Sequence, residues 1–397
     1  MKSKEYIPAL TGVRGLAAFL IFLDHYNQKG FPPLLFRIFN EFHFPLPMFF
    51  VLSGFLICLR YYDNVEVNKH WMRKYIKNRI ARVYPIYLIL TIATFLVAWI
   101  INDDSIYNNI SSHFTVFLLN ISFIRGFFDD IKFTGIAQGW SLTVEECFYF
   151  SAPFFFLLVQ RTKNWMIYLP LMFMGVGTLL VLLFRHVHFY GFFVDFKFMF
   201  IYTFFGRCME FFVGMGLALI IRKSDDTISK IPFYTYLGIL GIAGTTVIMV
   251  NQPISPELPY GLYQPIGIFT NNIILPFAIG AFFYGLIKEK SVIRYLLSTP
   301  FGQLNGRSSY IFYLIHLGFI AKFASTHIET FTSWFFEWLD AKELYWLTER
   351  QDVIEPIMLL TLLFGFLTVV SIILYKYVEE PLNLYIRKSS FLETKKV

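Results

Sequence analysis

The stretch YIPALTGVRGLAAFLIFLDHY, residues 6–26, decides the fold, because it is long and apolar enough to cross a bilayer yet contains ionisable side chains. A charge in hydrocarbon is costly, so Arg14 and His25 within one span indicate a functional site. The step of eleven residues from Arg14 to His25 turns a helix through about three turns plus roughly 20° and advances it about 16 Å. Both side chains are therefore predicted on one stripe of the helix, near opposite faces of the membrane.

The composition extends this interpretation to the whole chain. It is 56% apolar and 20% aromatic, with 49 Phe, which is more than a soluble globular protein shows. The sequence predicts an all-α, polytopic membrane protein with about ten transmembrane helices. The segment 110–128 is apolar but interrupted by Asn120 and Arg125, so we expect it to be interfacial or re-entrant. The predicted spans lie near residues 8–26, 44–62, 84–101, 140–159, 165–184, 200–221, 233–250, 268–287, 308–325 and 355–377.

Basic residues predict the orientation. Lys and Arg gather in the segments that are cytoplasmic if the N-terminus is cytoplasmic, so both termini are expected there. We expect one transmembrane domain over 1–382 and a short basic cytoplasmic tail over 383–397. The predicted location is the cell membrane, multi-pass, or the inner membrane in a Gram-negative bacterium. The net charge of +7 follows from these loops and does not indicate a nucleic-acid partner.

The loop HWMRKYIKNRIARVYP, residues 70–85, is the most basic stretch. Arg79 and Arg82 are three residues apart and therefore share a helix face, and Lys77 precedes them. One interpretation is an anchor on anionic lipid headgroups. The other is a phosphate clamp for a cytoplasmic donor.

Other polar residues also interrupt the apolar spans. In GWSLTVEECFYF, residues 139–150, the carboxylates of Glu145 and Glu146 are expected about 8–9 Å inside the fourth span. Because a carboxylate at that depth is costly, a functional role is favoured over a structural one. Asp24, as the neighbour of His25, need not share its helix face. For the remaining candidates a structural role is favoured. They are His43 as a packing residue, Arg207 with Glu210 as an ion pair, and His316 as a satisfied core histidine. No spacing of ligands suggests a metal site.

These stretches together resemble an ordered set of motifs in the acyltransferase-3 family of integral-membrane acyltransferases. Residues 6–26 resemble its first-helix Arg-x10-His motif, and FFVLSGFLI resembles its second-span motif. RIARVYPIY resembles its Arg-x-x-Arg loop, and WSLTVEECFYF its Trp-Ser-Leu-x-x-Glu motif. SSYIFYLIH and YVEEPL resemble its ninth- and tenth-span motifs. The set runs from residue 6 to about residue 382.

The resemblance implies ten transmembrane helices and transfer of an acyl group, with acetyl as the expected one, from cytoplasmic acyl-CoA. The acceptor it implies is a hydroxyl of a cell-envelope carbohydrate, a lipid-linked sugar or a small molecule, so polysaccharide O-acetylation is one expected role. Position matching assigns functional roles to Arg14, His25, Arg79, Arg82 and Glu145. Some members carry an additional C-terminal esterase-like domain, which we do not expect here.

A mechanism follows as an expectation. CoA phosphates would bind Arg79, Arg82 and Lys77, and the thioester arm would pass Arg14 to reach His25. His25 would act as general base, oriented or charge-balanced by Glu145, while Arg14 holds the donor or offsets oxyanion charge. A covalent acyl-His step is an alternative. A transporter or lipid-linked sugar flippase without acyl-transfer chemistry also fits buried Arg, Glu and His.

Overall fold

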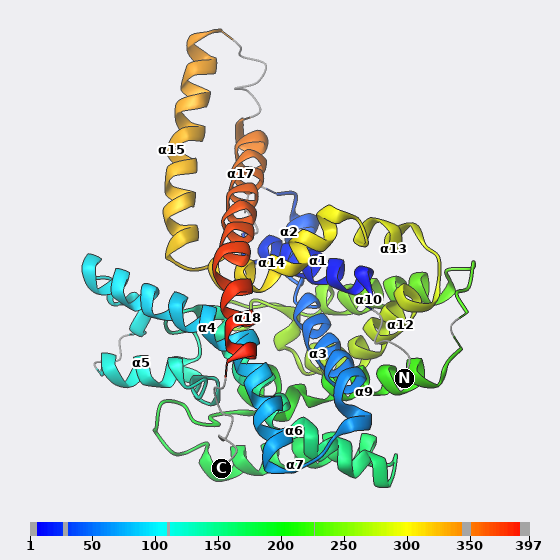
Figure 1. The fold of residues 1–397 in the computed structure, drawn as a ribbon. Coiled ribbons are helices and arrows are strands. Elements are labelled where there is room, and N and C mark those ends of the chain that lie inside the picture. The colour runs from blue at the N-terminus through cyan, green and yellow to red at the C-terminus, as the bar shows by residue number, and fades with distance from the viewer. Residues whose placement is uncertain (1–5, 27–30, 109–111, 226, 344–350, 390–397) are drawn as a thin grey trace.

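The fold is a bundle of helices, seen in a computed structural model that describes residues 6–26, 31–108, 112–225, 227–343 and 351–389 (Figure 1). Within these ranges the chain forms α- and 3-10 helices, two π-helical turns and no β-strand. The prediction of an all-α polytopic protein is therefore confirmed. The longer helices are α1 (Pro8–His25), α3 (Pro45–Tyr61), α4 (Lys69–Ile101), α6 (Trp140–Arg161), α7 (Trp165–Phe184), α9 (Phe204–Lys223), α10 (Phe233–Val250), α12 (Leu275–Lys288), α14 (Pro300–Ile315), α15 (Phe319–Ala341) and α17 (Gln351–Leu374).

Among the described residues, eight helices are long and apolar enough to cross a membrane, or nine if the bent pair of α14 and α15 counts as one. The additional predicted span is α1, which forms a helix but is less apolar because it contains Arg14, Asp24 and His25. Short helices join the long ones: α2 (Pro33–Phe39), α5 (His113–Ile121), α8 (Phe196–Tyr202), α11 (Pro265–Phe269), α13 (Val292–Leu297) and α18 (Glu380–Lys388).

Close backbone contacts hold the centre of the bundle together. Helix α3 packs against α9, where a Cβ at Gly54 would overlap the carbonyl of Phe211 and one at Gly214 would overlap the carbonyl of Val51. Helix α1 packs against α14 in the same way, because a Cβ at Gly306 would overlap the carbonyl of Thr11. Small residues permit this close approach of membrane helices. These contacts fix the position of α1, which carries Arg14 and His25.

Loops predicted on the same side of the membrane contact one another. On the predicted cytoplasmic side, the amide of Gln160 donates to the carbonyl of Tyr62 at 2.5 Å. On the predicted outer side, Arg37 donates to the carbonyl of Val250 at 2.6 Å. The pairing agrees with the predicted alternation of loops, while the assignment of one face as cytoplasmic stays a prediction. The predicted domain boundary at 382/383 lies inside α18, and residues 390–397 of the predicted tail lie outside the described residues.

The span predicted at 308–325 is wrong as a continuous helix. The chain bends by 89° between α14 and α15, and the backbone at Gly318 is extended, with φ −86° and ψ −170°. Helix α15 then runs beside α17 as a hairpin that projects from the rest of the bundle (Figure 1). The bend leaves His316 directly after the last residue of α14, where its side chain is fully buried.

The prediction that 110–128 is not a span is confirmed for its described part. Helix α5 has nine residues, which reach only about 14 Å and cannot cross a bilayer. Arg125, in the turn that follows, is fully buried and donates to Asn120 and to the carbonyls of Thr134 and Ile136. Its charge therefore organises the connection between α5 and α6.

Candidate active site

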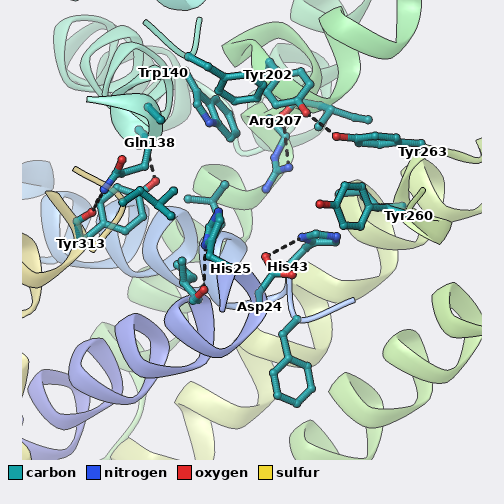
Figure 2. A pocket seen from close by; sticks show the side chains of 18 residues that line it. Asp24, His25, His43, Gln138, Trp140, Tyr202, Arg207, Tyr260, Tyr263 and Tyr313 are labelled. Atoms are coloured by element: carbon teal, nitrogen blue, oxygen red, sulfur yellow. Dashed lines mark hydrogen bonds and ion pairs between the residues drawn. The ribbon is translucent and has the colours of Figure 1, made fainter. Parts of the chain in front are cut away.

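His25 lies at one wall of a cavity of about 180 Å³, which we call the histidine pocket (Figure 2). The pocket is built by the ends of α1, α8 and α14, the loop between α2 and α3, the start of α3, the segment that leads into α6, α9 and the loop between α10 and α11. Its polar and aromatic lining residues are Asp24, His25, Phe42, His43, Phe133, Gln138, Trp140, Tyr202, Arg207, Tyr260, Tyr263 and Tyr313.

Hydrogen bonds fix the tautomer of His25. Its Nδ1 lies 2.8 Å from the carbonyl oxygen of Ile21, and a carbonyl can only accept, so Nδ1 carries the proton. The fully buried His316 donates from its own Nδ1 to the carbonyl of Tyr313 at 2.8 Å, which leaves its Nε2 as an acceptor 3.4 Å from His25 Nδ1. The lone pair of neutral His25 is therefore on Nε2. This is the arrangement that a general base requires.

Five rings from four parts of the chain form a continuous arc opposite His25, which we call the aromatic arc: Trp140, Tyr202, Tyr263, Tyr260 and His43 (Figure 2). Trp140 contacts Tyr202 edge-on at 4.8 Å, and the hydroxyls of Tyr202 and Tyr263 are hydrogen-bonded at 2.8 Å. Tyr263 contacts Tyr260 at 5.1 Å, and Tyr260 contacts His43 at 4.9 Å. The linked rings form a rigid wall with an apolar surface and polar edges.

His43 lies between two carboxylates. Its Nδ1 is 3.4 Å from Asp24 Oδ2 and its Nε2 is 4.0 Å from Glu41 Oε2. Burial alone would lower the pKa of His43, but the charges of Asp24 and Glu41 outweigh it and raise the pKa above its usual value. Glu41 in turn accepts N–H groups from Gly261 and Leu262, which holds the loop that carries Tyr260 against the pocket.

Arg207 and Glu210 form the ion pair that the sequence predicted. Arg207 Nε donates to Glu210 Oε2 at 3.1 Å and Nη2 lies 2.9 Å from Oε1, with both side chains buried. The structure adds that Arg207 lines the histidine pocket, with its guanidinium directed toward the space in front of His25 (Figure 2). A positive charge therefore faces the candidate base within the same cavity.

Arg14 belongs to a second polar region, which we call the arginine–glutamate cluster: Arg14, Arg82, Glu145 and Glu379. Arg14 is partly exposed and interacts electrostatically with the other three. Arg82 Nη1 lies 3.3 Å from Glu379 Oε1. Glu145 accepts from the hydroxyls of Ser53 at 2.8 Å and Tyr149 at 3.3 Å. No described hydrogen bond engages the Arg14 guanidinium, so its donors are available to a ligand.

The predicted orienting role of Glu145 toward His25 does not match these contacts. The residues described at His25 Nδ1 are Ile21 and His316, whereas Glu145 bonds Ser53 and Tyr149 near Arg14. The physical reason is its position on α6: Trp140 lines the histidine pocket, and Glu145 is more than one helical turn further along. A peptide carbonyl and a second histidine hold His25 instead.

The basic loop is helical and forms the first part of α4, which begins when Asn68 accepts the N–H of Trp71 at 2.8 Å. Arg79 lies 5.6 Å from the ring centre of Tyr149, beside the arginine–glutamate cluster, and its buried Nε has no hydrogen-bond partner among the described residues. Lys77 is buried and donates to the carbonyl of Ser389 at 3.0 Å. This lysine therefore ties the end of α18 to α4.

Of the residues that line the pocket, His25 is the one for which the sequence predicted a functional role, so several others were missed. His43 was interpreted as a packing residue, and Asp24 was said not to need the helix face of His25. His316, interpreted as a satisfied core histidine, contacts His25 instead of lining the pocket. Asp24 and His25 are the last two residues of α1, and both line the pocket. One signal was available: Asp24 and His43 lie at predicted outer ends of spans, and Tyr260 lies in a loop predicted on the same outer side.

The chain belongs to the acyltransferase-3 family, since the family's acyltransferase domain matches residues 7–376, nearly the whole chain. The resemblance of the motifs is thereby confirmed. The matched region is an acyltransferase domain, and this membership favours acyl transfer over the transporter alternative. No solved structure matches the chain.

Curated relatives are distant and carry transferase names. "Putative O-acetyltransferase SACOL0978" of Staphylococcus aureus (strain COL) is 23% identical over 355 residues, which cover 83% of this chain and 53% of that protein. "Acyltransferase MdmB" of Streptomyces mycarofaciens is 27% identical over 173 residues, 39% of this chain and 40% of the relative. "Putative acetyltransferase ORF330" of Acidianus two-tailed virus is 29% identical over 162 residues, 40% of this chain and 44% of the relative. The chain spans about half the length of these relatives or less.

Proposed function

We propose that this protein is an O-acyltransferase of the cell membrane that moves an acyl group, acetyl in the first instance, from cytoplasmic acyl-CoA to a hydroxyl of a carbohydrate or related acceptor. The observation that carries the proposal is the state of His25. Its Nδ1–H is committed to the carbonyl of Ile21, which leaves Nε2 as a base in a cavity that also contains Arg207. The O-acetyltransferase names of the relatives support acetyl as the group and oxygen as its acceptor.

The donor would bind at the other end of the bundle. Arg79 offers an unpaired, buried Nε, and Arg82 is half-exposed beside Glu379. Planar guanidinium groups bind phosphate through two parallel hydrogen bonds. Lys77 is a weaker phosphate ligand than the sequence suggested, because it already donates to Ser389. The phosphates of CoA would therefore rest on Arg79 and Arg82, with the thioester arm directed along α1 past Arg14.

Three helices link the two regions. Helix α1 carries Arg14 and His25, α6 carries Glu145 and Trp140, and α14 carries Tyr310 and Tyr313. Each contributes one residue to the neighbourhood of the arginine–glutamate cluster and another to the histidine pocket. An extended thioester arm that follows α1 would cover the advance of about 16 Å between Arg14 and His25.

Four residues of this chain would share the chemistry. His25 Nε2 removes the proton of the acceptor hydroxyl as its oxygen attacks the thioester carbonyl carbon. The tetrahedral oxyanion faces the guanidinium of Arg207, while Arg14 holds the donor arm and Glu145 balances its charge. The C–S bond then breaks, the ester forms, and the proton on His25 passes to the departing CoA thiolate. A covalent acyl-His25 route would use the same Nε2 and the same leaving group.

The replacement His25→Gln tests the base, with His327→Gln as a matched control. His327 also donates its Nδ1 to the carbonyl four residues earlier, at 2.8 Å, but it is exposed on α15 and outside the pocket. We expect His25→Gln to reduce the rate of acetyl transfer by about 10²- to 10⁴-fold and His327→Gln to leave it unchanged. Wild-type activity in His25→Gln, with normal membrane insertion, would reject the proposed base.

Equilibrium binding of acetyl-CoA tests the donor site. The double change Arg79→Ala with Arg82→Ala should weaken binding by tenfold or more, about 1.4 kcal/mol, because it removes both phosphate ligands. Arg73→Ala with Lys74→Ala removes the same charge from the same basic segment and should leave binding within about twofold, with the Coulomb effect screened by salt. Equal weakening by both pairs would indicate a diffuse charge effect rather than a clamp.

A further inference from the structure

The pocket wall opposite His25 is equipped to recognise more than a hydroxyl. The aromatic arc presents apolar ring faces and edges to the cavity, and its polar edges are partly satisfied internally, as in the 2.8 Å bond between the hydroxyls of Tyr202 and Tyr263. Flat, rigid aromatic surfaces of this kind match a ligand that has an apolar face and a polar rim. Pyranose rings have that form, because their C–H groups lie on the faces and their hydroxyls lie around the edge.

The polar groups beside the arc have unused hydrogen-bonding capacity. His43 Nε2 is buried and has no hydrogen-bond partner among the described residues, since Glu41 lies 4.0 Å away. The Asp24 carboxylate lines the cavity next to His25 and contacts His43 through one oxygen only, at 3.4 Å. A buried polar atom without a partner calls for a ligand or water. A carboxylate oxygen and an imidazole nitrogen side by side suit a pair of neighbouring hydroxyls.

The charges beside Asp24 and His43 do not suit an anion. Arg207 faces the cavity on the side of His25, and Glu210 balances its charge in a buried ion pair. Among the described residues, Asp24 at the cavity and Glu41 behind it contact one titratable cation, His43. Lys132 is paired with Asp129 at 2.6 Å, and Lys197 lies 5.3 Å from the Tyr263 ring but does not line the cavity. Because two carboxylates lie beside a single imidazole, a negatively charged ligand would meet like charge.

We infer that Asp24 and His43, with the aromatic arc, form the acceptor subsite and select a neutral pyranose ring over an anionic sugar. This inference rests on the proposed function, because it names the class of acceptor that would meet His25. The cavity of about 180 Å³ accommodates one sugar ring at a time. Asp24 accepts a hydroxyl next to the reacting one, which leaves the reacting hydroxyl in front of His25 Nε2.

Two probes of the same shape that share every hydroxyl test the selection: methyl β-D-glucuronamide has a neutral carboxamide where methyl β-D-glucuronide has a carboxylate. Their dissociation constants are measured by ligand-observed NMR on the purified full chain in lipid nanodiscs, with methyl β-D-glucoside as the hexose reference. The wild type should bind the glucuronamide at least about tenfold more tightly than the glucuronide. Asp24→Asn should reduce that ratio to within about threefold, because it removes the repelling charge while keeping a similar shape.

Asp104→Asn is the control. Asp104 is exposed on the same predicted side of the membrane as Asp24 but lies outside the pocket. Asp104→Asn therefore changes the net charge by the same amount as Asp24→Asn but should preserve the tenfold ratio. Equal binding of the two probes by the wild type, a ratio unchanged in Asp24→Asn, or no binding of any probe would overturn the inference. CoA release from acetyl-CoA is followed in the same samples. Selective binding without CoA release would leave the subsite standing and count against the proposed transferase chemistry.

Discussion

The buried ion pair of Arg207 and Glu210 permits a double-mutant cycle that separates structure from chemistry. The side chains are 2% and 0% exposed, and two contacts of 3.1 and 2.9 Å join them. Arg207→Met leaves a buried carboxylate without its partner, for which we expect a loss of about 3–5 kcal/mol. The double variant Arg207→Met with Glu210→Gln leaves neither charge unpaired. Its loss should be well below that of Arg207→Met alone, on the order of 1 kcal/mol.

The assay is thermal unfolding of the purified protein in detergent, combined with acetyl transfer by the same samples. Stability should recover in the double variant, whereas activity should not. The double variant should regain most of the unfolding temperature lost in Arg207→Met yet remain about 10²- to 10³-fold less active than wild type, because the guanidinium proposed to stabilise the oxyanion is still missing. If destabilisation by the double variant equals or exceeds the sum of the two single losses, the reasoning about the pair is refuted. Full activity in the double variant would remove Arg207 from the mechanism.

Two further predictions concern stability. Gly54→Ala should destabilise the protein by about 3 kcal/mol or more in the same unfolding assay, because its methyl group would overlap the carbonyl of Phe211. The control Gly175→Ala on α7 meets no atom within 4 Å and should have little effect. Equal effects of the two changes would contradict the packing argument. The raised pKa of His43 makes its protonation stabilising below about pH 6.5 and progressively less so as pH rises through the raised pKa. The stability advantage of wild type over His43→Gln should therefore shrink as pH rises above about 6.5, and a difference independent of pH would contradict it.

Much of the fold could be predicted because bilayer thickness imposes a simple length rule. The spans predicted at 165–184 and 233–250 coincide with α7 and α10, and the span predicted at 140–159 differs from α6 by two residues at its end. The failure at 308–325 also has a physical reason. A hydropathy average includes the apolar residues on both sides of Gly318 and contains no information on the direction of the chain. The 89° bend therefore could not be predicted from it.

Within one helix, the sequence alone was sufficient. The helical repeat predicted the ion pair of Arg207 with Glu210, and the motifs indicated the family to which the chain belongs. Residues of different helices could not be related in this way. The pairing of helices depends on contacts such as that of Gly54 with Phe211. The complementary shapes of two helices are visible only once both have folded and packed.

Tertiary structure alone decided the composition of the site. It placed Glu145 with Arg14 instead of His25, and it gathered Asp24, His43 and Arg207 around one cavity. From their own segments, His43 and Arg207 were predicted to have structural roles, and Asp24 was assigned no role. Their shared surroundings arise because helices and loops far apart in sequence end at the same level of the bundle, and the cost of burying charge requires that such groups meet partners there.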